Sequence, residues 1–179
     1  MVHEEREGFA VWITGLPASG KSAVTAALLT SLRQRGVRVE VLESDVLRRQ
    51  FSANPRYDDL EREYFYGSIV LIGRVLTENG IAVIFDATAN RRVWRERARQ
   101  QIPHFLEIYV DCPLEVCMQR DPKGIYRRGR AGEAQHVPGL QAEYEPPENP
   151  DVIIRGDRDT PEYGAAQILK ILEARGMLR

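Results

Sequence analysis

One stretch near the N-terminus constrains the fold of this chain more than any other feature. Residues 15–22 read Gly-Leu-Pro-Ala-Ser-Gly-Lys-Ser, which matches the pattern G-x-x-x-x-G-K-[ST]. An apolar, β-rich run at 9–13 leads into it, and an amphipathic segment at 21–35 follows it. In such a context the glycines let successive backbone N–H groups point at phosphate oxygens, and the helix N-terminus assists them. The stretch therefore predicts a phosphate-binding loop between a buried strand and a helix.

The same pattern assigns roles to single residues. Lys21 is expected to bridge the β- and γ-phosphates of ATP as a catalytic cation, and the Ser22 hydroxyl to ligate Mg²⁺. The predicted phosphate-binding residues are Gly15, Leu16, Pro17, Ala18, Ser19, Gly20, Lys21 and Ser22. A guanine-specific [NT]-K-x-D sequence is absent, which argues against a GTPase, and an ATPase motor would need a longer chain. The alternative is a strand, turn and helix that carry a lysine by chance.

Strands and helices alternate along the rest of the chain. Further strands are expected at 37–42, 81–85, 105–110 and 152–154, and helices at 45–51, 57–79, 91–101, from 113 onward and at 161–175. Continuous apolar strands between helices indicate an α/β fold with a doubly wound, parallel, five-stranded sheet. Ligands bind at the carboxyl ends of such strands, so the functional loops should follow Ile13, Leu42, Phe85 and Val110.

Composition fits one ordinary domain, and we expect residues 1–179 to form it. Hydrophobic residues make up 43% and charged residues 28% of the chain, and the net charge of −1 gives no reason to expect a nucleic acid partner. The polar start of the chain and the lack of a long apolar run predict a cytoplasmic protein without membrane contact. Cys112 and Cys117 are expected to be packing residues. Between about 120 and 150, basic residues, glycines and prolines predict a functional or disordered loop.

Several stretches together resemble the adenylylsulfate (APS) kinase family. Residues 120–133 are similar to its R-D-P-K-G-L-Y-x-x-A-R-A-G-E segment, and 144–147 to its Y-E-x-P. Residues 111–115 resemble part of its Y-V-D-x-P-L-E run, and the stretch 43–48 resembles its Asp-Gly-Asp-Asn-x-Arg. With a D-R pair matched at 59–62, the resemblance covers about residues 8–155.

The resemblance implies a P-loop NTPase fold of the nucleoside-monophosphate-kinase type, with residues 120–150 as a mobile lid. It implies ATP as the donor, Mg²⁺ as the cofactor, and transfer to the 3′-hydroxyl of APS, giving PAPS in sulfate assimilation. It also implies that a homodimer is common. Asp45 would be catalytic beside Lys21 and would hold Mg²⁺ with Ser22. The implied acceptor-binding residues are Asp45, Arg48, Arg62, Phe65, Arg92 and Val137, and the lid cations are Arg120, Lys123, Arg127 and Arg130.

The acceptor side departs from the family pattern. Val137 stands where the family has a phenylalanine that stacks on adenine, and Phe65 is the aromatic residue that we expect to replace it. Residues 88–92 keep only the final arginine, Arg92, of the family's I-S-P-Y-R. Loss of a stacking aromatic residue costs about 1–3 kcal/mol. A kinase acting on another nucleotide, sugar or small hydroxyl compound is therefore the first alternative, and a non-catalytic ATP-binding regulatory module is the second.

Two carboxylates, Asp45 and Asp86, have a structural interpretation beside the functional one. Asp45 follows a strand and precedes a helix, so it is either a catalytic residue or a helix N-cap. Asp86 ends a strand in the sequence Asp-Ala-Thr-Ala-Asn, so it is either a second carboxylate near Mg²⁺ or a cap of the next helix.

Overall fold

The computed structural model of the chain describes residues 7–178. Its strands are β1 (Ala10–Thr14), β2 (Val39–Glu43), β3 (Ala82–Asp86), β4 (Phe105–Asp111) and β5 (Val152–Arg155). Its helices are α1 (Lys21–Gln34), α2 (Ser44–Phe51), α3 (Asp59–Glu78), α4 (Arg92–Gln101), α5 (Leu114–Arg120), α6 (Ile125–Arg130) and α7 (Pro161–Ala174).

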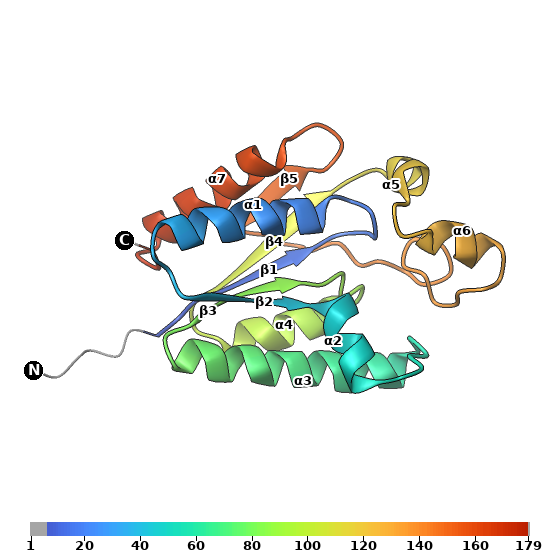
Figure 1. Cartoon of the computed structure of the whole chain (residues 1–179), viewed down its shortest axis with the longest axis horizontal. Coiled ribbons are helices and arrows are strands. Elements are labelled where there is room, and N and C mark those ends of the chain that lie inside the picture. The colour runs from blue at the N-terminus through green and yellow to red at the C-terminus, as the bar shows by residue number, and fades with distance from the viewer. Residues whose placement is uncertain (1–6, 179) are drawn as a thin grey trace, which may run out of the picture.

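The five strands form one sheet in the order β2-β3-β1-β4-β5, and every pair of neighbours is parallel. Helices α1 and α7 cover one face of this sheet, and α3 and α4 cover the other (Figure 1). Parallel strands need crossover connections, and here helices on both faces supply them. The prediction of an α/β, doubly wound, parallel five-stranded sheet is confirmed.

The central strands are buried on both faces. All five residues of β1 are buried, and so are those of β3. Because successive strand side chains point to opposite faces, Val11 and Ile13 pack with α1 and α7, whereas Ala10 and Trp12 pack with α3 and α4. The apolar runs in the sequence therefore contribute side chains to two separate cores, one on each side of the sheet.

Helix α3 begins two residues later than the sequence analysis predicts. Tyr57 has a φ of 59°, in the left-handed region, so it cannot be the first residue of an α-helix. The helix instead starts after Asp58, whose side chain accepts a hydrogen bond from the backbone N–H of Glu61. Asp58 is therefore the N-cap of α3, a position that aspartate often takes. The sequence pattern did not identify which residue would cap this helix.

The segment 120–150 is more ordered than its composition predicts. It contains the short helix α6, and Tyr126 and Val137 are buried within it. These two side chains form a third apolar cluster with Cys112 and Cys117, and Leu16 of the phosphate-binding loop packs against that cluster. The segment is therefore folded onto the domain and is not a disordered loop, because a few apolar residues among the charged ones suffice to anchor it.

Among residues 7–178, no helix combines the length and the apolar character that crossing a membrane requires.

Candidate active site

The carboxyl ends of the strands meet at one edge of the sheet, where the phosphate-binding loop lies between β1 and α1 (Figure 1). The loop depends on Gly15, whose φ is 151°. A Cβ atom on Gly15 would lie 2.5 Å from the carbonyl oxygen of Val110 and 2.8 Å from the Ser19 hydroxyl, so no other residue fits. The sequence pattern thus folds into the tight backbone turn that a phosphate cradle needs.

Lys21 is held against its own loop. Its Nζ donates to the carbonyl oxygens of Gly15 (3.1 Å) and Leu16 (2.8 Å), and only 8% of the residue is exposed. Burial lowers the pKa of Lys21, while the nearby carboxylates of Asp86 and Asp45 partly oppose that shift. A phosphate group entering here would offer this ammonium a charged partner in place of two neutral carbonyls.

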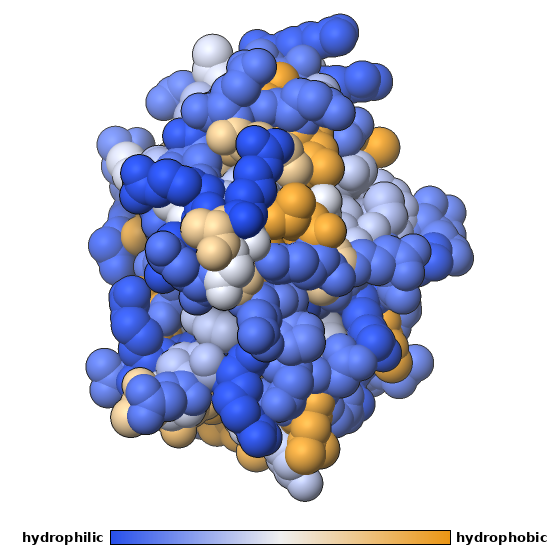
Figure 2. Space-filling view, turned by 90° about the vertical axis from the view of Figure 1, so that its right-hand side faces the viewer, coloured by the Kyte–Doolittle hydropathy of each residue, from blue (hydrophilic) through white to orange (hydrophobic). Residues whose placement is uncertain are grey.

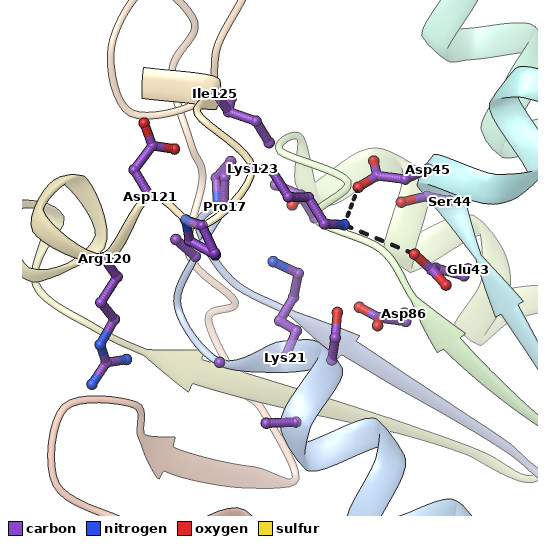
Figure 3. A pocket seen from close by; sticks show the side chains of 16 residues that line it. Pro17, Lys21, Glu43, Ser44, Asp45, Asp86, Arg120, Asp121, Lys123 and Ile125 are labelled. Atoms are coloured by element: carbon purple, nitrogen blue, oxygen red, sulfur yellow. Dashed lines mark hydrogen bonds and ion pairs between the residues drawn. The ribbon is translucent and has the colours of Figure 1, made fainter. Parts of the chain in front are cut away.

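A cavity of about 360 Å³ opens directly above the loop (Figure 3). Of the predicted phosphate-binding residues, Pro17, Ala18, Gly20, Lys21 and Ser22 line it. Of the other three, Gly15 and Ser19 are buried, and Leu16 is partly buried and packs against the third apolar cluster. Among residues 7–178, the Ser19 hydroxyl is one of the buried side-chain groups without a hydrogen-bond partner.

Asp45 lies across this cavity from Lys21 and contacts the lid (Figure 3). Its carboxylate accepts a hydrogen bond from Lys123 Nζ at 2.7 Å, and Glu43 lies 3.9 Å from the same ammonium. This hydrogen bond raises the pKa of Lys123. Helix α2 starts at Ser44, its N-cap position is held by Glu43, and no side chain caps it. The structure therefore gives no support to the helix-capping interpretation of Asp45.

Asp86 is the second carboxylate in the same cavity. It ends β3 and is buried, with 5% of its surface exposed, and it forms no salt bridge within residues 7–178. The N-cap of the next helix, α4, is Arg91, so Asp86 does not cap that helix. Ser22, Asp45 and Asp86 thus bring hydroxyl and carboxylate oxygens to one cavity, which is the hard-oxygen donor set that Mg²⁺ prefers.

A larger cavity of about 1030 Å³ adjoins the first, and both are lined by Pro17, Glu43, Ser44, Asp45, Thr88, Lys123 and Ile125. Four of the predicted acceptor residues, Asp45, Arg48, Arg62 and Val137, line the larger cavity. Figure 2 looks at this end of the molecule and shows a mostly hydrophilic surface with apolar areas in its upper half and near its lower edge. A charged ligand with an apolar ring would suit such a surface.

The other two predicted acceptor residues lie outside that lining. Phe65 is buried in the α3–α4 core, and the guanidinium carbon of Arg48 lies 4.0 Å from the centre of its ring. A base can stack on Phe65 only if Arg48 moves away. Arg92 is turned toward Glu145 and Glu148, and it forms a salt bridge with each of them.

Arg62 joins three segments around the larger cavity. Its Nε donates to the Tyr57 carbonyl (2.8 Å) and its Nη2 to the His136 carbonyl (2.7 Å), and its Nη1 donates to the Asn90 side chain. Burial lowers the pKa of this guanidinium. Asn90 in turn donates to the Glu143 carbonyl at 2.7 Å. Arg62 and Asn90 therefore fasten the lid's return segment to α3 and to the loop after β3.

The four predicted lid cations take different positions. Arg120 is the last residue of α5 and belongs to the lining of the small cavity, but its guanidinium donates to the Gly156 carbonyl at 2.8 Å and in Figure 3 extends away from Lys21. Lys123 reaches into the small cavity. Arg127 and Arg130 are exposed on α6, where they do not belong to the lining of either cavity. Arg128, which the sequence analysis did not select, lines the larger cavity instead.

Sequence reasoning also missed Tyr57 and Asn90. Tyr57 lines the larger cavity and is 39% exposed, and the Arg48 guanidinium carbon lies 4.8 Å from the centre of its ring. Its position in a loop between a proline and a helix cap was the available signal, since loops carry binding residues disproportionately often. Asn90 ends the Asp-Ala-Thr-Ala-Asn stretch, which the sequence analysis used for Asp86 alone.

The comparisons with known proteins agree with this geometry. The family described as "Adenylylsulphate kinase" matches residues 7–155. A probable adenylyl-sulfate kinase from Archaeoglobus fulgidus is 42% identical over 84% of this chain and 97% of its own length. An adenylyl-sulfate kinase from Synechococcus sp. (strain JA-3-3Ab) is 36% identical over 97% of this chain and 99% of its own length.

Solved structures give the same result. The APS kinase CysC of Mycobacterium tuberculosis, in complex with AMPPNP and APS, superimposes with a TM-score of 0.87 at 32% identity, covering 93% of this chain and 98% of CysC. A sugar kinase from Janibacter sp. HTCC2649, at 18% identity and a TM-score of 0.64 over 96% of this chain and 99% of its own, shares the fold. With a family match over residues 7–155 and relatives that are 42% and 36% identical over most of their length, this chain belongs to the adenylylsulphate kinase family.

Proposed function

We propose that the protein transfers the γ-phosphoryl group of ATP to the 3′-hydroxyl of adenylyl sulfate and so forms PAPS, a step of sulfate assimilation. The observation that carries the proposal is the position of Asp45, which lines both the cavity above the phosphate-binding loop and the larger cavity beside it. A donor in the first and an acceptor in the second would meet at this carboxylate. Family membership and the named adenylyl-sulfate kinases among the relatives support APS as the acceptor.

Phosphoryl transfer needs positioning and charge stabilisation more than covalent help from the protein. The backbone of residues 15–22 would hold the β- and γ-phosphates, and Lys21 would leave its two carbonyl partners to follow the transferred group. Asp45 would orient the acceptor hydroxyl and accept its proton. Lys123, now paired with Asp45, would turn toward the phosphates and leave that carboxylate free for the acceptor.

Ser22, Asp45 and Asp86 would hold Mg²⁺, directly or through water. When bound, the ion neutralises charge on the β- and γ-phosphates. Among residues 7–178, no group of three or more acidic, histidine or cysteine side chains could bind a metal by itself. This suits an ion held mostly by phosphate oxygens and water.

A different hydroxyl acceptor is the competing proposal, because Phe65 and Val137 are both buried and offer no stacking face to a base. The test is the specificity constant of the unmodified protein for APS, measured as ADP release and PAPS formation, with ATP hydrolysis without acceptor as the control. We expect a kcat/KM of about 10⁴ M⁻¹s⁻¹ or more, the usual enzyme range. A value far below that, with another hydroxyl compound phosphorylated faster, would reject APS and keep the kinase assignment.

We place the enzyme in the cytoplasm, with ATP and a small acceptor as its partners and with no nucleic acid. We also infer that it forms a homodimer. An exposed apolar face on α3 supports this inference, and a relative solved from Thiobacillus denitrificans is described as a hexameric APS kinase.

A further inference from the structure

The loop between β3 and α4 contributes to the walls of both cavities. Asp86, where β3 ends, lines the small cavity, Thr88 lines both cavities, and Asn90 lines the larger one. The backbone of this loop is strained, because Ala89 has a φ of 38°, in the left-handed region that residues with a Cβ atom rarely adopt. Such a conformation persists only where the surrounding structure holds it in place.

Four consecutive carbonyl groups of this loop accept hydrogen bonds from groups outside it. The Trp12 indole donates to Ala87 (3.0 Å), the Thr14 hydroxyl to Thr88 (2.6 Å), the Arg95 guanidinium to Ala89, and the Glu145 backbone N–H to Asn90 (2.8 Å). Trp12 and Thr14 belong to β1, so the sheet itself fixes the first half of the loop. The second half, which contains the strained residue, is held instead from α4 and from the segment 120–150.

Arg95 binds three different segments through its three side-chain nitrogens. Its Nη1 donates to the Ala89 carbonyl, its Nη2 to the Glu145 carbonyl at 2.6 Å, and its Nε to Glu107 at 2.7 Å. The side chains of Arg95 and Glu107 are 0% and 5% exposed. Because the guanidinium is planar and rigid, its bond to Glu107 of β4 fixes its direction. The Ala89 carbonyl is thereby held at a defined position relative to the sheet.

The hold on Ala89 extends to the larger cavity. The Ala89 carbonyl and the Asn90 N–H belong to one planar peptide unit, so fixing the carbonyl also sets the direction in which the Asn90 side chain leaves the backbone. That side chain accepts a hydrogen bond from Arg62 and donates to the Glu143 carbonyl at 2.7 Å, and Asn90 and Arg62 both line the larger cavity. Arg95 belongs to the lining of neither cavity, so it would reach a ligand only through this loop.

We propose that Arg95, oriented by Glu107, is a positioning residue for the acceptor. It holds Ala89 in the strained conformation that places Asn90 and Arg62 at the larger cavity. The inference rests on the proposed function, because it takes the larger cavity to be the acceptor site, but it does not depend on which hydroxyl compound binds there. The competing explanation is a buried ion pair that affects stability alone.

Arg95→Lys separates these two explanations. Lysine keeps a positive charge beside Glu107, but one ammonium cannot reproduce the fork of donors that reaches both carbonyls. We expect the KM for APS to rise about tenfold or more, since a misplacement of about 1 Å can cost about a hundredfold. The KM for ATP should stay unchanged, because Asp86 and Thr88 on the nucleotide side are held from β3 and β1. An unchanged KM for APS in the folded variant would overturn the proposal.

Arg99→Lys is the matched control. Arg99 lies on the same helix and pairs with the same carboxylate, since its Nη2 is 3.2 Å from Glu107, but within residues 7–178 it has no hydrogen bond to the loop. A purely structural role of the ion pair predicts similar kinetics for the two variants. An equal rise of the KM for APS in Arg99→Lys would therefore reject a specific role of Arg95.

The paired variant Arg95→Met/Glu107→Leu covers the case in which Arg95→Lys does not fold. It removes both buried charges together, so neither of the two is left without its partner, and such replacements are often tolerated. Methionine has no donor for the Ala89 carbonyl, so the KM for APS should rise as in Arg95→Lys. A folded double variant with the KM of the wild type would overturn the proposal.

Hydrogen exchange of the full chain tests the hold on the loop without any acceptor. The Ala89 N–H donates to the Tyr66 hydroxyl at 3.1 Å, and mass spectrometry of peptides that span residues 86–92 reports its exchange. This exchange should be faster in Arg95→Lys than in the wild type and in Arg99→Lys. Faster exchange in an enzyme whose wild type does not use APS would reject APS alone, and the kinetic comparison would then use the hydroxyl compound that is phosphorylated fastest. Equal exchange in all three proteins would overturn the positioning role.

Discussion

The smallest change that tests the donor site is the loss of the Lys21 ammonium. Lys21→Ala removes the cation that would follow the γ-phosphoryl group, so turnover should fall a hundredfold or more, roughly the effect of losing one transition-state donor. Binding of ATP should weaken less, because the backbone cradle remains. Initial rates of ADP release and calorimetric ATP affinity measure the two effects. Lys170→Ala, an exposed lysine on α7, is the control, and near-normal turnover in Lys21→Ala would contradict the assignment.

Asp45 can be tested without changing its shape. Asp45→Asn removes the charge that would orient the acceptor hydroxyl and hold Mg²⁺, so we expect a large loss of kcat. Thermal stability should hardly change, because the side chain is 43% exposed and does not cap α2. Asp59→Asn, whose carboxylate pairs with Arg91 at the surface, is the control. A variant that melts early but keeps normal activity per folded molecule would restore the capping interpretation.

We propose that the adenine of APS stacks on Tyr57, whose ring is partly exposed in the larger cavity. Tyr57→Ala should raise the KM for APS about ten- to a hundredfold, the effect of losing about 1–3 kcal/mol of base stacking, and leave the KM for ATP unchanged. Tyr57→Phe should keep most of the affinity. Phe65→Ala should act differently: it removes a core side chain, which typically costs about 3–5 kcal/mol of stability. If Phe65→Ala instead folds normally and weakens only APS binding, the base stacks on Phe65 after all.

At the scale of single elements, the lid is the segment whose order should depend on nucleotide. Proteolytic cleavage between Arg120 and Arg130 should slow when Mg-ATP is added, because bound phosphates would fix Lys123 and the residues around it. Time courses of trypsin digestion measure this effect. Tyr126 anchors α6, since its hydroxyl donates to the Pro17 carbonyl at 3.1 Å. Tyr126→Phe should therefore be cleaved faster than the wild type without nucleotide, and equal cleavage with and without Mg-ATP would argue against closure.

The elements themselves could be predicted where the sequence is periodic. Apolar runs located all five strands, because parallel strands buried on both faces leave an almost unbroken apolar signal. The phosphate-binding loop could be located because its glycines are required by geometry, as Gly15 shows. Helix α6 could not be located from the sequence, because it has only six residues and is rich in arginine. It is held in place by the burial of Tyr126 against residues that are distant in the sequence.

The acceptor site was the least predictable part, because it too depends on contacts between residues that are distant in the sequence. The three groups that Arg62 binds come from widely separated segments, and two of them are backbone carbonyls, which carry no residue identity. The sequence could suggest that Arg62 belongs near the acceptor, but not that its donors are occupied by protein groups. Likewise, the burial of Phe65 beneath Arg48 depends on packing between α2 and α3.

At the scale of the whole molecule, buried ionic contacts connect the sheet to the site. Glu107 lies between apolar residues of β4, and Arg95 of α4 donates to it at 2.7 Å with both side chains almost fully buried. The same guanidinium donates to the Glu145 carbonyl at 2.6 Å, near the end of the segment 120–150. Arg95 thus links the central sheet to the return part of that segment, and a strand pattern alone could not reveal this.

Buried weak acids make the stability of the whole molecule sensitive to alkaline pH. Burial raises the pKa of Cys117 from 9.0 to about 12 and that of Tyr144 from 10.0 to about 12, and the pKa values of Tyr109 and Tyr126 also rise. Between pH 9 and pH 12 the unfolded chain therefore loses these protons before the folded one does. The stabilising contribution of these groups is complete below pH 9 and is lost as the pH rises through this window. Lys21 acts in the opposite direction, because its pKa is lowered.

We therefore expect the urea concentration at the midpoint of unfolding to decrease as the pH rises from 8.5 to 10.5. The raised pKa values of several acids outweigh the lowered pKa of one lysine. Cys117→Ala should reduce this pH dependence, since it removes the group with the lowest unfolded pKa, even though the cavity that it leaves lowers stability at every pH. Native Cys117 should also react slowly with iodoacetamide at pH 8.5 and rapidly in urea, because the thiolate is the nucleophile. A midpoint independent of pH, with rapid alkylation of the native protein, would show that this thiol ionises as freely in the folded chain as in the unfolded one.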